Sequence, residues 1–415
     1  MSAPTAKVQT SAGAWRTPLL IIVCGCLISM ISFGPRSALG FFLTPLSQAN
    51  HWGRDVFAFA VAIQNLLWGI GQPVAGAIAD RYGATRVLAA GAVLYALGLY
   101  MMASATTPLA LTWSAGVLIG FGLSGCAFAV VVGAFGKLVP PAWRSTAFGF
   151  GTAAGSFGQF LFSPLAVALM DKFGWQAALV VFAGLLVLIL PLSLVLMAPR
   201  DGGPSTVLAQ PEQSIKHAMM EAFGHRSYVL LVLGFFTCGF QLAFTTVHLP
   251  AYLVDRGLSA EIGGWTLAII GMFNIIGSIG SGYLGSRMPK RYILSIIYFA
   301  RAISIAIFVL LPASATTTLI YGAVTGLLWL STVPPTSGLV AVMFGTRWLT
   351  MLFGFAFLSH QIGSFLGVWL GGWVYDHYGS YNPVWWLAVG FGIASAIINL
   401  PITETPVARG AEAAV

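Results

Sequence analysis

Two arginines carry a charge that packing alone does not explain. Arg36 and Arg301 lie within long apolar segments, and we place none of the 11 acidic residues in the membrane interior, since Asp55, the second residue of its segment, falls at the outer end. An arginine in bilayer hydrocarbon costs at least about 2.5–3.5 kcal/mol on insertion scales, so its charge needs a partner. The guanidinium fork matches a carboxylate. We therefore expect Arg36, which follows the kink-forming Gly34-Pro35, to bind an anionic substrate.

Each arginine also has a structural interpretation. Arg36 could reach the outer interface or bond backbone carbonyls. Arg301 lies nine residues into its segment and could equally bond neighbouring helices. Counting helices does not decide whether Arg301 reaches a central cavity, so both interpretations stay open for it.

His360 is the proton-coupling candidate, because an unperturbed imidazole has a pKa near 6.5. It lies about halfway along its apolar segment, where it could carry a proton or bind the anion. The alternative is a neutral imidazole hydrogen-bonded between helices. His248, near the outer end of another segment, is the weaker candidate.

The remaining polar lining consists of amides and hydroxyls. The candidates for substrate binding are Asn65, Gln159, Gln241, Asn274 and Gln361. Each could equally join two helices through a hydrogen bond. Pro334-Pro335, flanked by hydroxyl residues, should break its helix, and the break could be a gate or only a bend.

The sequence gives no metal-site spacing. Cys24, Cys26, Cys126 and Cys238 all fall in apolar runs, so we interpret them as small buried hydrophobic side chains. The membrane interior also holds no acid and no nucleophile paired with a base. We expect no metal, no cofactor and no enzymatic activity.

The composition requires that these residues be held in a membrane. Charged residues make up 7% of the 415 residues, against about 25% in soluble domains, and the mean hydropathy is +0.88. Thirty charged side chains cannot cover the surface of a soluble globule of this size. A cytoplasmic enzyme, a nucleic-acid binder and a disordered protein are therefore excluded.

Twelve segments are long and apolar enough to cross roughly 30 Å of hydrocarbon. They are 17–46, 54–79, 86–105, 108–138, 145–170, 175–198, 227–254, 262–286, 292–312, 316–343, 348–375 and 382–402. The first is too long for a cleaved signal peptide. The sequence predicts an all-α membrane protein with two pseudo-symmetric six-helix halves.

One long polar connection separates the halves. We expect an N-terminal tail at 1–16, a first bundle at 17–198, a linker at 199–226, a second bundle at 227–402 and a C-terminal tail at 403–415. Of the 19 basic residues, fourteen fall in the loops and tails that an inside N-terminus puts inside, and three outside. This bias predicts a cell (inner) membrane protein with both termini cytoplasmic.

The two halves repeat each other at a shift of 205 or 206 residues. The matching pairs are Pro45 and Pro250, Gly76 and Gly282, Arg81 and Arg287, Gly149 and Gly354, Asp171 and Asp376, and Gly174 and Gly379. Chance matches are common in a glycine-rich chain, but Asp-x-x-Gly recurs at the same loop. Two six-span halves in one orientation are the parallel repeat of a large transporter class.

The loop after the second segment reads Gly76-Ala-Ile-Ala-Asp80-Arg81-Tyr-Gly83-Ala-Thr-Arg86. This resembles the cytoplasmic signature of the major facilitator superfamily, and the resemblance covers nearly the whole chain. It implies a gating role for Gly76, Asp80, Arg81, Gly83 and Arg86, with Gly76 allowing close helix contact. The second copy has Ser286 in place of Asp80 and is degenerate.

Within that superfamily the chain is similar to monocarboxylate porters and oxalate/formate exchangers. The resemblance rests on Gly40 to Leu46, on His248 to Ser259 and on Leu358 to Gly367. Those porters usually carry an acid and an arginine in the eighth span, where this chain has Asn274 and Ser278. The exchangers have a lysine near the place of His360. The family's substrate arginine therefore has no match in the eighth span.

These observations predict a secondary transporter of a small organic anion, in the first place a monocarboxylate, that works by alternating access. Its partners would be the lipid bilayer, the anion and, in a symporter, protons; anion exchange is the other coupling. We expect a monomer. The alternatives are multidrug or metabolite efflux by proton antiport, disfavoured by the missing buried acid and Gly-Pro pair in the fifth span, and a transporter-like sensor, disfavoured by short tails.

Overall fold

The computed structural model describes residues 16–197, 214–345 and 348–407, and every regular element among them is helical. Twelve stretches of these residues are long and apolar enough to cross a membrane. Each agrees with a predicted segment to within four residues at either end, so the predicted all-α membrane fold is confirmed.

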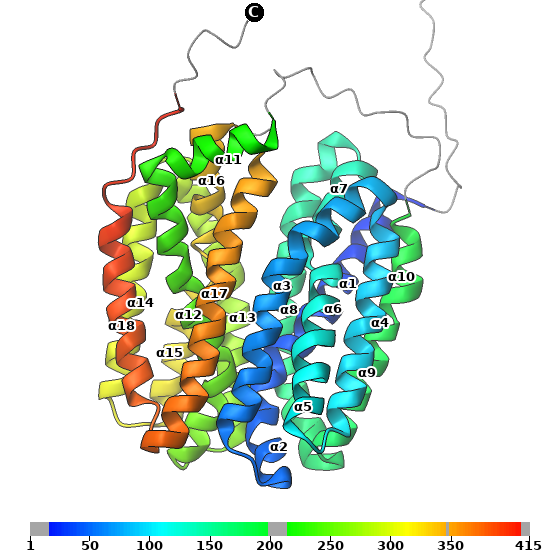
Figure 1. Ribbon diagram of the computed structural model, residues 1–415, viewed down its shortest axis with the longest axis vertical. Helices are drawn as coiled ribbons and strands as arrows, with labels where there is room; N and C mark the ends of the chain where they lie inside the picture. Colours follow the sequence, from blue (N-terminus) through cyan, green and yellow to red (C-terminus); the bar gives the residue numbers. More distant parts are fainter. Residues whose placement is uncertain (1–15, 198–213, 346–347, 408–415) are drawn as a thin grey trace, which may run out of the picture.

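The helices α1 to α10 gather on one side of the molecule and α11 to α18 on the other (Figure 1). We call them the first and second bundles. The first contains α1 (Pro18–Ala38), the 3-10 turn η1 (Leu39–Phe42), α2 (Leu43–Asn50), α3 (Arg54–Tyr82), α4 (Ala84–Ala103), α5 (Pro108–Leu111), the π-helix η2 (Thr112–Leu118), α6 (Ile119–Cys126), α7 (Phe128–Leu138), α8 (Pro141–Phe173), α9 (Trp175–Val187) and α10 (Ile189–Val195).

The second bundle contains α11 (Ile215–Gly224), α12 (Arg226–Asp255), α13 (Ala260–Gly285), α14 (Lys290–Leu310), α15 (Ala315–Leu328), α16 (Val333–Phe344), α17 (Leu349–Tyr378) and α18 (Asn382–Asn399). The helix α11 was not predicted. Ser214 caps it, and Phe223 packs against Tyr228 and Phe355. The predicted tails and linker otherwise lie mostly outside the described residues.

The two bundles meet along two seams, α3 against α17 and α8 against α13. Glycines allow the close approach: Gly69 of α3 lies against Gln361, and Gly271 of α13 against Ser156 and Phe160. In the same way Gly363 and Gly367 let α17 pack on the α12 backbone within the second bundle. Small residues at such contacts are typical of membrane helices.

The seams are closed at the end of the molecule that carries Arg54, which we call the Arg54 end. There Arg54 pairs bidentately with Asp255 at 2.7 Å and donates to the Tyr381 hydroxyl at 2.9 Å. Asp376 accepts the backbone N–H groups of Arg54 and Asp55 at 3.1 and 2.7 Å. We call Arg54, Asp255, Asp376 and Tyr381 the latch, because it joins the two bundles.

At the opposite end, where α11 lies on the second bundle, the ribbons of the two bundles diverge (Figure 1). A Cβ added at Gly76, Gly149, Gly280 or Gly354 would meet nothing within 4 Å among the described residues. Among the described residues, the close helix contact predicted at Gly76 is therefore not made in this conformation. The molecule is closed at the Arg54 end and open at the α11 end.

Four spans are interrupted among the described residues; in the sixth, a turn at Leu188 that was not predicted separates α9 from α10. The predicted break of the tenth span is confirmed, but it lies at 329–332 and the prolines occupy the first turn of α16. A proline fits there because the first turn has no intrahelical partner for its missing N–H. The first span passes through η1, and the fourth contains a π-helix and an extended residue, Ala127; neither was predicted.

Candidate functional site

Arg36 belongs to the last turn of α1, directly after Pro35. Its Nη2 donates to Oδ1 of Asn65 on α3 at 2.8 Å, and its guanidinium lies over the Trp68 ring at 4.6 Å. Its Nε has no hydrogen-bond partner among the described residues. The amide and the ring hold the fork in place without neutralising it.

The absence of a buried acid, predicted from the sequence, holds for the part of the chain whose side chains are described. The buried charged and polar residues there include Arg301 but no aspartate or glutamate. A cation held by an amide and an aromatic face keeps its charge, so Arg36 stays available to an anion.

An aromatic pair connects Arg36 to the second bundle. Trp68 of α3 meets Phe357 of α17 edge to face at 5.5 Å, and Phe357 stacks on the His360 ring at 5.5 Å. The indole N–H donates to Gln72 at 2.9 Å, which fixes the ring. Arg36 and His360, predicted independently, therefore lie at the two ends of one cross-bundle aromatic contact.

His360 and Gln361 carry polar side-chain atoms near this seam that have no hydrogen-bond partner in the described part of the chain; the His360 ring also packs on Phe235 and lies beside Cys238 within the second bundle. Nδ1 of His360 and both amide atoms of Gln361 are buried without a partner among the described residues. Gln361 is 0% exposed and packs against Gly69, one turn along α3 from Asn65. A buried polar group without a partner costs about 1–3 kcal/mol, so a ligand that satisfied these atoms would gain that energy.

Arg301 lies inside the second bundle, 2% exposed. Its guanidinium donates to the carbonyls of Leu328 and Trp329, at the break of the tenth span. These are C-terminal carbonyls of α15, which have no helical N–H partner and carry the negative end of the helix dipole. The structural interpretation of Arg301, a bond to a neighbouring helix, thus has direct partners.

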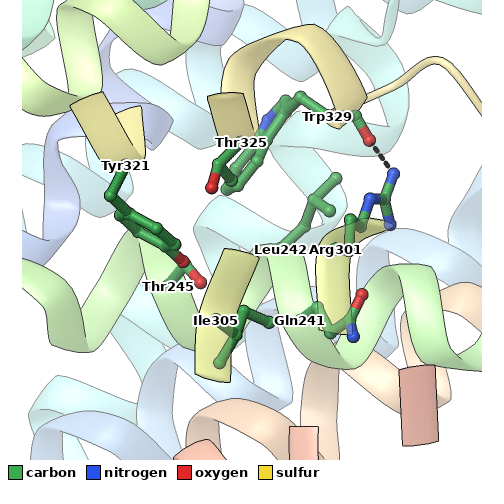
Figure 2. A pocket seen from close by; sticks show the side chains of 8 residues that line it. All are labelled: Gln241, Leu242, Thr245, Arg301, Ile305, Tyr321, Thr325 and Trp329. Atoms are coloured by element: carbon green, nitrogen blue, oxygen red, sulfur yellow. Dashed lines mark hydrogen bonds between the residues drawn. The ribbon is translucent and has the colours of Figure 1, made fainter. Parts of the chain in front are cut away.

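A small cavity beside Arg301 limits what could bind there. Figure 2 shows it between α12, α14 and α15, with the Gln241 amide on the side of the guanidinium. Its volume is about 10 Å³, which suits a single water and no carboxylate. In this conformation Arg301 and Gln241 are therefore separate from the Arg36 site.

The other predicted amides hold the structure together. Gln159 donates across the seam to Leu267 at 3.1 Å, and Gln241 donates to Ala388 at 2.9 Å. Asn274 donates to Ser156 across the seam at 2.9 Å and accepts from Leu330 N–H at the helix break at 3.0 Å. The structure thus groups Arg36, Asn65, His360 and Gln361, and leaves the rest as links.

Sequence reasoning missed Trp68, Phe357 and the latch. Trp68 lies three residues after Asn65, and Phe357 three before His360, so helical spacing could have suggested the two aromatics. The latch joins residues more than 200 apart and left no local signal. Of the gating motif, Gly83 has φ +94° where α3 ends, and Arg86 is exposed; the side chains of Asp80 and Arg81 lie outside the described residues.

Comparison with known proteins identifies the family of this chain. Residues 25–358 match the family model of the Major Facilitator Superfamily. The chain is 28% identical to an uncharacterised MFS-type transporter, YcxA, of Bacillus subtilis (90% of this chain, 91% of the relative). It is 24% identical to monocarboxylate transporter 13 of Rattus norvegicus (95% and 91%).

A solved structure shares the fold. The bacterial homologue of the human lysosomal transporter Spinster, described as inward-facing and unoccupied, matches with a TM-score of 0.70 at 14% identity, over 94% of this chain and 95% of that one. At this identity the likeness concerns the fold alone.

Proposed function

Since the chain belongs to the Major Facilitator Superfamily and is a secondary transporter, we propose that its substrate is a small organic anion, with a monocarboxylate as the first candidate. The observation that carries the proposal is Arg36, a cation at the seam whose described partners are one amide and aromatic rings. The distant monocarboxylate transporters among its relatives support the same class.

The substrate would lie between the bundles. Arg36 and Asn65 belong to the first bundle, and His360 and Gln361 to the second. A carboxylate held by the Arg36 fork and by the Gln361 amide would satisfy atoms from both sides, with Trp68 and Phe357 against its apolar body. Binding would thus join bundles that separate at the α11 end, which is the linkage that alternating access needs.

The charge of the proposed substrate indicates that its transport is coupled to a second ion. An anion that enters a cell with a negative interior works against about 2.3 kcal/mol per 100 mV. Entry of a proton with the anion, or exchange for another anion, removes that cost. We assign the proton to His360, whose Nδ1 has no partner among the residues described. In the proposed orientation both termini are cytoplasmic, the membrane is the cell (inner) membrane, and the α11 end opens inward.

The test is uptake of radiolabelled lactate, pyruvate and oxalate by the purified full chain in liposomes, with and without a pH gradient. Arg36→Gln should reduce uptake of the transported anion by roughly ten- to a hundredfold, since a hydrogen bond to a charged group contributes about 1.5–3 kcal/mol. Arg36→Lys keeps the charge without the fork, so it should retain part of the activity.

Arg256→Gln is the matched control. Arg256 is exposed at the Arg54 end, where it stacks on Tyr252, and its loss should leave uptake unchanged. Uptake of a cation but of no carboxylate, or near-normal affinity in Arg36→Gln, would refute the proposal. Stimulation by a pH gradient that His360→Gln abolishes supports proton coupling; stimulation only by an anion on the far side supports exchange.

A further inference from the structure

A buried histidine stands directly behind the latch. His248 of α12 is 0% exposed and lies against Gly371 of α17, at a distance that only a glycine permits. Its Nε2 is 2.8 Å from the Val368 carbonyl, and its Nδ1 is 3.4 Å from the Tyr381 hydroxyl. Tyr381 in turn accepts from Arg54 at 2.9 Å. A chain of contacts therefore runs from the latch arginine to the imidazole.

For a neutral imidazole, the donors and acceptors of this chain fit one arrangement. A carbonyl only accepts, so Nε2 of His248 carries a hydrogen and donates to Val368. The guanidinium only donates, so the Tyr381 oxygen accepts from Arg54 and its own hydrogen is free to point at Nδ1. Burial raises the pKa of the Tyr381 phenol, which therefore keeps that hydrogen. Nδ1 is the acceptor, and His248 is neutral while the latch is closed.

A proton on Nδ1 would oppose this arrangement twice. The new N–H of His248 and the phenolic hydrogen of Tyr381 would then point at each other. The proton would also add a buried positive charge one phenol away from the Arg54 guanidinium. Burial of the ring and the like charge on Arg54 both oppose that proton, whereas the Asp376 carboxylate attracts it. When the latch opens, both the ring and Arg54 gain water, and the proton is no longer opposed.

We propose that His248 is a proton sensor of the Arg54 end: its protonation and closure of the latch exclude each other. Acid on that side then holds the molecule open there, and deprotonation allows closure. The proton comes from solution to Nδ1 in the open state and returns to solution before the latch closes. His248 therefore regulates the gate, whereas the proposed carrier, His360, accompanies the substrate. The inference does not depend on which anion is transported.

Other titratable or charged groups face the same region from each neighbouring element. They are Arg54 and Asp55 of α3, Tyr252 and Asp255 of α12, Tyr375, Asp376 and His377 of α17, and Tyr381 before α18. Of these, Asp255 and Asp376 belong to the latch, Asp55 is next to Arg54 in the chain, and His377 is exposed. A test must therefore separate His248 from Asp55, His377 and the nearby His51.

The experiment measures the opening itself, with no substrate present. Spin labels on cysteines introduced at Ala49 and Glu261, exposed positions on opposite bundles at the Arg54 end, report the distance between the bundles by electron paramagnetic resonance. For an imidazole of ordinary basicity in the open state, the ratio of closed to open molecules should fall about thirtyfold from pH 8 to pH 5.

His248→Gln should remove this response, and Asp55→Asn, His51→Gln and His377→Gln should keep it. Tyr381→Phe deletes the hydrogen that points at Nδ1, so the pH at which half of the molecules are closed should rise. This second variant tests the proposal if His248→Gln does not fold. A ratio that is the same at both pH values in the unsubstituted chain overturns the proposal. So does an undiminished response in a folded His248→Gln protein.

Discussion

Removing the carboxylate of Asp376 should open the Arg54 end. Asp376 of α17 accepts the N–H groups of Arg54 and Asp55, the first two residues of α3. It thus caps a helix of the other bundle, while Gly53, the residue in the cap position, offers no side chain. A helix cap contributes about 1 kcal/mol. Because the cap exists only when the seam is closed, Asp376→Ala should lower the closed-to-open ratio about fivefold.

The internal repeat supplies the matched control. Asp171 is the counterpart of Asp376 in the first half, at a shift of 205 residues, and is exposed near the end of α8. Its partner helix across the other seam, α13, begins without a side-chain cap. Asp171→Ala should therefore leave the spin-label distances between Ala49 and Glu261 unchanged at pH 8. Equal effects of the two substitutions, or none from Asp376→Ala, would show that the cap does not hold the bundles together.

Two further predictions concern residues around the site. Arg301→Gln should lower the free energy of unfolding by roughly 1–3 kcal/mol, because the Leu328 and Trp329 carbonyls lose their donor; thermal unfolding in detergent measures this, and full stability with abolished uptake would instead return Arg301 to substrate binding. Trp68→Leu should weaken the apparent affinity for the anion about threefold to tenfold, because Arg36 loses the ring that holds it; a KM from liposome uptake checks it, with the exposed Trp113→Leu as control.

The architecture was predictable because each span satisfies its requirement locally. A membrane helix needs about 20 apolar residues and forms its backbone hydrogen bonds within itself. The segments predicted from the sequence therefore match all twelve spans of the structure, and the paired prolines correctly predicted that the tenth span is broken. The position of that break was less predictable, since proline is tolerated in a first turn and the chain unwinds just before Pro334.

The candidate site was predictable only in part, because the direction of a side chain depends on how the bundles assemble. Arg36 and Arg301 look alike in the sequence: each is a lone cation in an apolar run. In the structure Arg36 binds Asn65 and lies over Trp68, which contacts the second bundle. Arg301 instead donates to the carbonyls of a broken helix that no pattern in its own segment predicts. The break at 329–332 created the alternative partner, so the two arginines could be distinguished only once both spans were placed.

The latch stabilises the closed state by an amount that suits a transporter working by alternating access. Arg54 and Asp255 are partly exposed, with 13% and 28% of their side-chain surface accessible, so solvent screens their bidentate ion pair, which contributes on the order of 1 kcal/mol. The Asp376 cap adds about 1 kcal/mol. A closed state favoured by only a few kcal/mol keeps the open state populated at 0.1–10%. One bound anion, or one proton at 1.36 kcal/mol per pH unit, is then enough to reverse the preference. A latch held by much stronger contacts would resist both signals, so weak polar groups suit a gate that has to open and close.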